Sequence, residues 1–191
     1  MKFFLLFIIF SLQFTFAQTD SILVDDFSDF LNVSADFYTS PLRFDSEDWI
    51  KISAVVGITA VASIADKEVR TFSQNNQSNF ADNLFSIDKY YYVEFMGASV
   101  IAFYGYGLIA ENNKIRRLAV KLTEAAFLST SLTLITKTII GRGRPYVQES
   151  QYSFNPFTFD NDYNSLPSGH TTLAFAYSTV MANEVDNVFW K

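Results

Sequence analysis

The chain has 191 residues, enough for one domain or for one domain with a tail. It contains no cysteine, which excludes a disulfide framework and a thiolate metal site. Its formal net charge of −6 argues against general nucleic-acid binding, because that function requires a dense basic surface. Local clusters of basic residues are therefore informative against this acidic background.

A secretory signal peptide is predicted over residues 1–17. Lys2 provides the positive charge, "FFLLFIIF" the apolar core, and "TFAQ" the small residues before cleavage at Gln18. An uncleaved membrane anchor is the alternative, but the apolar core is shorter than the about 20 residues of a transmembrane helix. We expect an exported protein in which residues 18–47, a tail or short helical lead-in, precede the main domain.

The remaining residues, 48–191, are expected to form one helical domain. Apolar helices without strong helix breakers are predicted over residues 49–65, 90–110 and 115–140, and a fourth helix begins near Ser168. Two stretches separate them: a polar loop or surface helix at 71–88, and an aromatic and polar loop at 146–166. The sequence shows no alternating strand pattern, so the predicted fold class is all-α, a bundle of long helices.

The apolar helices leave open whether the domain lies in a membrane. Their uncharged runs of 14, 16 and 12 residues fall short of about 20, and such runs also occur in buried core helices. Aromatic residues near the helix ends, Trp49 and Tyr90 to Tyr92, are placed like those at a membrane interface. A basic cluster between the second and third helices would mark a cytoplasmic loop: Lys114, Arg116, Arg117 and Lys121.

Counting membrane crossings favours two spans over three. If all three helices crossed from an exported N-terminus, the basic cluster would lie outside, against the positive-inside rule. We therefore expect residues 49–65 to form a partial or peripheral helix. Helices 90–110 and 115–140 would then cross the inner membrane, so that residue 141 faces the periplasm. A soluble periplasmic bundle is the alternative.

Three cations gather around the predicted end of the third helix: Lys137, Arg142 and Arg144. Gly141 supplies a helix stop and Pro145 prevents continuation, so both arginines project from a tight turn beyond Lys137. A guanidinium group matches phosphate oxygens in a planar fork, whereas lysine acts as a point charge. A solvated basic helix end that complements the helix dipole is the simpler interpretation of this cluster alone.

The segment "PSGH" contains the only histidine of the sequence. Ser168 is predicted to cap the fourth helix, and Gly169 leaves room for a ligand to approach the backbone. The N–H groups of a helix N-terminus bind anions, and His170 in the first turn can donate a proton to a leaving oxygen. An ordinary helix cap with an incidental histidine is the alternative for this tetrapeptide alone.

Together, "KTIIGRGRP" and "PSGH" resemble two motifs of the type 2 phosphatidic acid phosphatase and vanadium haloperoxidase superfamily. The first fits Lys-x6-Arg-Pro, and the second follows it across one loop. The resemblance covers about residues 49–185 and implies a helical domain with the first motif at the end of a long helix.

The resemblance implies a role for each matching residue. Lys137 and Arg144 would hold the phosphate. Ser168 and the backbone N–H of Gly169 would contact its oxygens, and His170 would be the general acid that protonates the leaving group. The phosphatase reaction of this superfamily requires no metal and no cofactor.

Two features depart from the motifs. Arg142 is not a fixed position, and its role as an additional phosphate contact is inferred from its spacing. The nucleophile of this superfamily is a second histidine, in a third motif of the form Ser-Arg-x5-His-x3-Asp, and these 191 residues contain only one histidine. We expect the chain to be the front portion of a longer enzyme, with a short inactive relative as the alternative. Reading the coding sequence beyond Lys191 decides between them.

The full-length protein is therefore expected to be a phosphohydrolase of lipid phosphates or diphosphates, acting through a phosphohistidine intermediate. Phosphatidate, phosphatidylglycerol phosphate and polyprenyl diphosphate represent the expected substrate class, and the membrane is the expected partner. A soluble periplasmic acid phosphatase and an inactive phosphate- or lipid-binding remnant are the alternatives. Vanadate-dependent halide oxidation is disfavoured, because this short, acidic, aromatic-rich chain is unlike the large soluble haloperoxidases.

Overall fold

The computed structural model describes residues 2–86, 93–146, 150 and 152–184. Every regular element in this part of the chain is helical, which confirms the predicted all-α class. In chain order the elements are α1 (Lys2–Thr39), η1 (Ser40–Arg43), α2 (Ser46–Ala62), η2 (Ser63–Ala65), α3 (Asp66–Asn75), α4 (Asn79–Phe85), α5 (Val93–Ile109), α6 (Asn113–Ile140), η4 (Asn161–Tyr163) and α7 (Gly169–Glu184).

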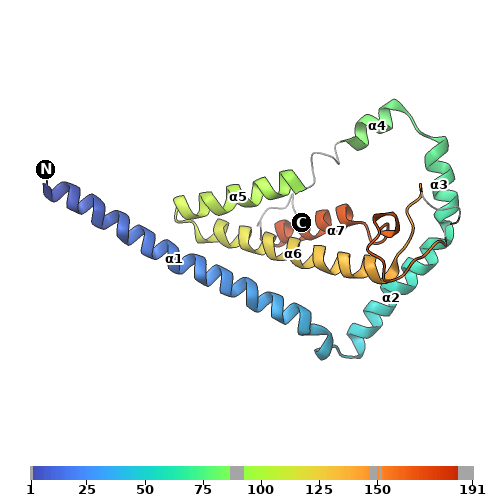
Figure 1. Cartoon of the computed structure of the whole chain (residues 1–191), viewed down its shortest axis with the longest axis horizontal. Coiled ribbons are helices and arrows are strands. Elements are labelled where there is room, and N and C mark those ends of the chain that lie inside the picture. The colour runs from blue at the N-terminus through green and yellow to red at the C-terminus, as the bar shows by residue number, and fades with distance from the viewer. Residues whose placement is uncertain (1, 87–92, 147–149, 151, 185–191) are drawn as a thin grey trace.

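Helix α6 is the central element, and α5, α7 and α1 pack against it (Figure 1). Five residues form the buried cluster between α5, α6 and α7: Met96, Leu118, Leu122, Leu173 and Tyr177. A hydrogen bond of 2.7 Å between the hydroxyls of Ser99 and Tyr177 joins α5 to α7. These contacts fix both ends of the bundle that carries the two motifs.

The lead-in segment is helical and lies along α6. The side chains that face α6 recur every four residues, which places them on one face of α1: Asp26, Phe30, Ser34 and Tyr38. The Phe30 ring lies 5.2 Å from that of Phe127, and the Tyr38 hydroxyl lies 2.6 Å from that of Ser131. Helix α1 is continuous across the predicted cleavage site before Gln18. Cleavage at this site and the division of the chain at residues 17 and 47 stay predictions.

A mostly buried ion pair fixes one end of this contact. Asp26 of α1 pairs with Arg116 of α6, and the two side chains are only 12% and 10% exposed. The Tyr104 hydroxyl of α5 donates a hydrogen bond of 2.8 Å to the same carboxylate. Three helices therefore meet at one carboxylate, and removing it would leave the buried Arg116 charge without its partner.

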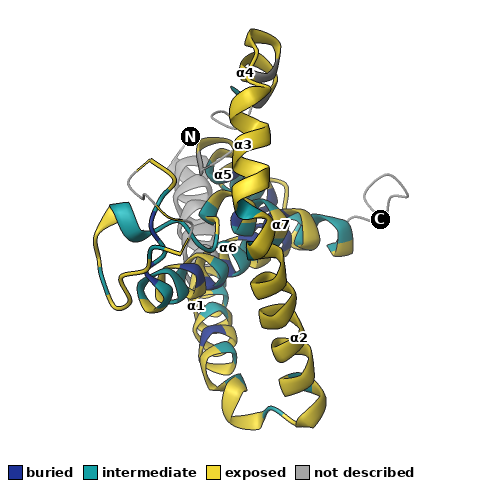
Figure 2. Ribbon diagram, turned by 90° about the vertical axis from the view of Figure 1, so that its right-hand side faces the viewer, coloured by how far each residue is buried: buried dark blue, intermediate teal, exposed yellow. Residues whose placement is uncertain are grey.

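Helix α2 begins at a complete capping box. The Asp45 carboxylate accepts the N–H groups of Glu47 and Asp48 at 2.8 and 3.0 Å, and the Asp48 carboxylate accepts the N–H of Asp45 at 3.4 Å. The helix then continues through η2 into α3. None of the residues of α2 is buried, and Figure 2 shows most of the helix in the colour of exposed residues.

The candidate membrane helices differ from those expected. By length and composition, two described helices could cross a membrane: Ser46–Asn75, with no buried residue in its apolar window, and Asn113–Ile140, with 28% of its window buried. The first contains the helix expected to be peripheral. Of the expected span at 90–110, Tyr90 to Tyr92 lie outside the described residues, and the rest contains a shorter apolar helix, Glu94–Ile109. The difference arises because the helix that begins at Asp45 continues past the apolar run into α3.

Replacing Asp26 by alanine is expected to destabilise the protein by about 3–5 kcal/mol, the usual cost of leaving one buried charge unpaired. Denaturant unfolding in mild detergent, followed by circular dichroism, measures the change. Asp25→Ala removes the same charge from the neighbouring exposed position and is the matched control, with an expected effect within about 0.5 kcal/mol. Equal effects of the two substitutions would contradict the role of the ion pair.

Candidate phosphate-binding site

Helix α6 ends at Gly141 as the sequence predicts. Gly141 has φ 58° and ψ 43°, the left-handed conformation that glycine adopts without steric cost, and its N–H donates to Lys137 O at 2.8 Å. A β-carbon at this position would lie 1.8 Å from Asn155 O. The turn therefore requires glycine both for its backbone conformation and for the close approach of the following loop.

Backbone hydrogen bonds hold residues 141–144 between two parts of the long loop. On one side, Asn155 N–H donates to Gly141 O at 2.7 Å and Gly143 N–H donates to Ser153 O at 2.9 Å. On the other side, Arg144 N–H donates to Asp162 O at 2.7 Å. The described part of the predicted loop, residues 152–166, thus supports the cationic turn.

Lys137 and Arg144 are both partly buried and act on each other through their positive charges. The Lys137 ammonium donates to Asn164 O, which ties α6 to the chain just before the second motif. Arg144 Nε is buried and has no hydrogen-bond partner among the described residues. Two mutually repelling cations with one unpaired donor form a site to which an anion with several acceptor oxygens is well suited.

Arg142 has a different environment from Arg144. Its guanidinium forms an ion pair with Asp66 of α3, at 2.5 Å between Nη2 and Oδ2. Its backbone oxygen accepts two hydrogen bonds from Ser165, from N–H at 3.1 Å and from Oγ at 3.0 Å. Part of its charge is therefore neutralised within the protein, and its direct contact with phosphate stays a prediction.

The second motif forms the start of α7. Ser168 Oγ accepts the N–H of Thr171 at 3.3 Å and the hydroxyl of Thr171 at 3.1 Å, which confirms the predicted cap. These two bonds use both acceptor positions of the Ser168 hydroxyl, so its own proton remains available for an anion. Gly169 is the first residue of α7, and His170 is exposed in its first turn.

The structure joins the two motifs through the loop, by the bonds from Lys137 to Asn164 and from Ser165 to Arg142. Two cavities lie near these motifs in the described part of the chain, one beside α3 and one beside α2. Of the six predicted site residues, only Arg142 lines the two principal cavities that the described residues form. The binding roles of the other five therefore rest on their motifs and on the contacts described above.

Three residues that support the cationic turn were not predicted from the sequence. Asp66 pairs with Arg142 across 76 positions of sequence, and Arg70 of the same helix donates to Pro145 O at 2.9 Å. Their spacing of four residues places both on one face of α3, which was the available signal. Asn164 contributes only its backbone oxygen, which a pattern of side chains in the sequence cannot predict.

Comparison with known families matches residues 118–191 to the family described as the PAP2 superfamily. The matched segment contains both motifs and all six predicted site residues, so the resemblance proposed from these motifs is confirmed. No curated protein and no solved structure matches the chain.

Gly141→Ala is expected to destabilise the protein by at least about 1–2 kcal/mol, the cost of a left-handed alanine, with the clash at Asn155 adding to it. Thermal and denaturant unfolding measure the effect. Gly57→Ala in α2 is the control, because its β-carbon would meet nothing within 4 Å. That change is expected to be neutral or stabilising by up to about 1 kcal/mol. A tolerated Gly141→Ala would mean that the turn does not fix the loop.

Proposed function

We propose that this chain, a member of the PAP2 superfamily by its match over residues 118–191, carries the phosphate-binding part of a phosphohydrolase for lipid phosphates or diphosphates. The superfamily is one of phosphatases, which supports a hydrolase role in general. The unpaired, buried Nε of Arg144 beside the charge of Lys137 is the observation that carries the proposal.

The described residues supply three chemical roles in this proposal. Lys137 and Arg144 neutralise the charge of the phosphoryl group, which is strongest in the transition state. The Ser168 hydroxyl and the N–H groups at the start of α7 donate to its equatorial oxygens. His170 gives its proton to the leaving oxygen as the P–O bond breaks. In the superfamily that these motifs resemble, attack on phosphorus, with formation of the P–N bond, belongs to the histidine of the third motif.

Binding of inorganic phosphate tests the site without requiring turnover. Lys137→Ala and Arg144→Ala are each expected to weaken binding at least tenfold in isothermal titration, since a hydrogen bond between charged groups contributes about 1.5–3 kcal/mol. Arg117→Ala removes an exposed charge near the opposite end of α6 and is expected to change binding less than twofold. Equal phosphate affinities of the Lys137→Ala, Arg144→Ala and Arg117→Ala variants would exclude the proposed site.

The contacts between α1 and α6 indicate on which side of the membrane α6 lies. Asp26, Phe30 and Tyr38 of the lead-in lie against residues 116–131 of α6. If the lead-in is exported, this part of α6 lies on the same side of the membrane. The expected cytoplasmic placement of the basic turn does not fit these contacts together with cleavage at Gln18. The exposed carboxylates of α1, which lie beside α6, also favour water there: Asp25, Asp29 and Asp36.

We therefore infer an exported helical bundle that is anchored in the inner membrane through α2. Eight large apolar side chains of the α2–η2 region are at least 38% exposed, including Val55, Ile58 and Val61. Water would be an unfavourable surrounding for so much apolar area, whereas lipid would not. The soluble periplasmic phosphatase remains the second candidate, supported by the acidic face of α1.

The substitution Ile58→Lys distinguishes the membrane-associated protein from the soluble periplasmic one. Ile58 is 70% exposed in α2, and a lysine within a membrane helix costs about 2.5–3.5 kcal/mol. Ile58→Lys is expected to move the protein from the membrane pellet into the carbonate wash, whereas Asn32→Lys on the exposed face of α1 is not. Wild-type protein that stays in the supernatant without detergent would exclude membrane contact.

A further inference from the structure

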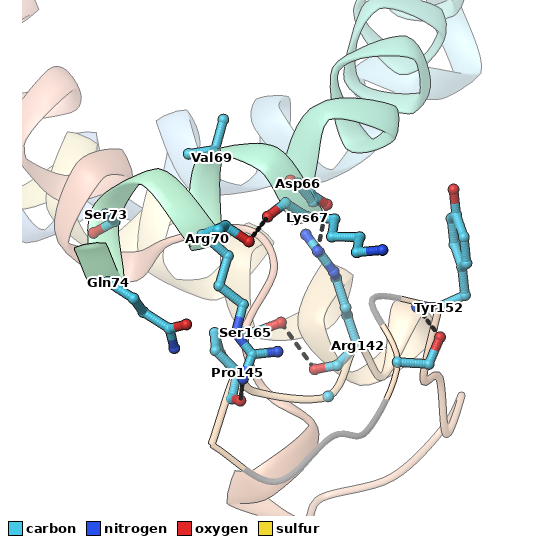
Figure 3. A pocket seen from close by; sticks show the side chains of 13 residues that line it. Asp66, Lys67, Val69, Arg70, Ser73, Gln74, Arg142, Pro145, Tyr152 and Ser165 are labelled. Carbon is cyan, nitrogen blue, oxygen red and sulfur yellow. Dashed lines mark hydrogen bonds and ion pairs between the residues drawn. The ribbon is translucent and has the colours of Figure 1, made fainter. Parts of the chain in front are cut away.

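A cavity of about 930 Å³ lies between α3 and the loop that follows α6. Figure 3 shows Arg70 reaching from α3 to Pro145 of the loop, and the Lys67 side chain extending beside that of Arg142. Hydroxyl and amide groups line the rest of the cavity, among them Ser73, Gln74 and Ser165. These groups offer hydrogen-bond donors around a cationic centre.

The cavity is positively charged, although the chain is not. Its lining contains three cations, Lys67, Arg70 and Arg142, and one carboxylate, Asp66, so the sum is +2. The whole chain carries −6. Asp66 is already paired with Arg142 at 2.5 Å, and Arg70 uses one of its donors on Pro145 O at 2.9 Å. Arginine has five N–H donors, so most of those of Arg70 remain for a ligand.

The cavity adjoins the proposed phosphate site without including it. Gly143 and Pro145 line the cavity, and these are the residues on either side of Arg144. Lys137, Arg144, Ser168 and His170 are outside its described lining. The cavity therefore borders the backbone turn that carries Arg144, and its cations differ from those of the proposed phosphate site.

We propose that this cavity binds a second phosphoryl group of the same ligand, through Lys67 and Arg70. The inference rests on the proposed function, because the first phosphoryl group is the one assigned to Lys137 and Arg144. It narrows the substrate class to molecules that carry a second anionic group directly beside the phosphoryl group that is hydrolysed. Arg142 would act as a positioning residue, because its pairing with Asp66 links α3 to the loop.

Two small ligands that cannot be hydrolysed test this proposal by calorimetry on the full chain. Methylphosphonate carries one phosphonate, and methylenebisphosphonate carries two that are linked. Wild-type protein is expected to bind the linked ligand at least tenfold more tightly. Lys67→Gln, which leaves the Arg70–Pro145 bond in place, is expected to reduce this preference several-fold. Lys67→Gln with Arg70→Gln is expected to abolish it, while methylphosphonate binding changes less than twofold.

A charge-matched control separates a local site from the general field of the protein. Arg43→Gln with Lys51→Gln also removes one arginine and one lysine, but at exposed positions outside the cavity lining. An equal loss of preference in this control, or an unchanged preference in the Lys67 and Arg70 variants, would overturn the proposal. Binding of two separate methylphosphonates with no preference for the linked ligand would also overturn it.

The proposed function has its own readout in the same experiment. Lys137→Ala is expected to weaken methylphosphonate binding, since that ligand needs only the first site. Failure of that result, with the preference for the linked ligand still dependent on Lys67, would reject the phosphate site and leave the cavity supported. The two ideas can therefore fail separately.

Discussion

The left-handed turn at Gly141 is the constraint on which the site depends. It ends α6 one turn after Lys137 and sends the chain under Asn155, where only a residue without a β-carbon fits. The following residues are then held by backbone hydrogen bonds to both sides of the loop, so the position of Arg144 relative to Lys137 is set by the backbone. The backbone therefore holds the positive charges of Lys137 and Arg144 close together without a bound anion, and the folded loop opposes the repulsion between them.

The helices divide into a packed group and an exposed one. Helices α5, α6 and α7 share a buried cluster around Leu122, and α1 adds the Asp26–Arg116 pair and its row of contacts. Helices α2 and α3, in contrast, have no buried residue and reach the rest of the protein near the loop, through Asp66 and Arg70. Packing energy therefore fixes the first motif to the second, whereas α3 is tied to this unit by charge and hydrogen bonds. That division suits a framework that binds one anion and a more weakly attached helix that faces the adjoining cavity.

Local signals in the sequence predicted most of the helical framework and the ends of the motifs. Gly141, Pro145 and Ser168 act on their immediate neighbours, so the end of α6 and the start of α7 were found within a residue or two. Contacts between distant segments were not predicted. The Asp26–Arg116 and Asp66–Arg142 pairs span 90 and 76 positions, and each depends on how helices are arranged in space. The membrane topology was expected from the charges of four basic residues between the second and third apolar helices. One of them, Arg116, is paired with Asp26, so its charge is a weaker guide to the side of the membrane on which it lies.

The contact between α1 and α6 also has a consequence for the order of events during biosynthesis. The lead-in helix is made before α6, but the surface that it covers includes Arg116, made 90 residues later. Until then the carboxylate of Asp26 and the ring of Phe30 have no partners in α6, and water is their only solvent. Closing so long a loop comes late in folding, since its entropic cost precedes the contacts that reward it. Although α1 is made before α6, it thus reaches its final place only after α6 has formed.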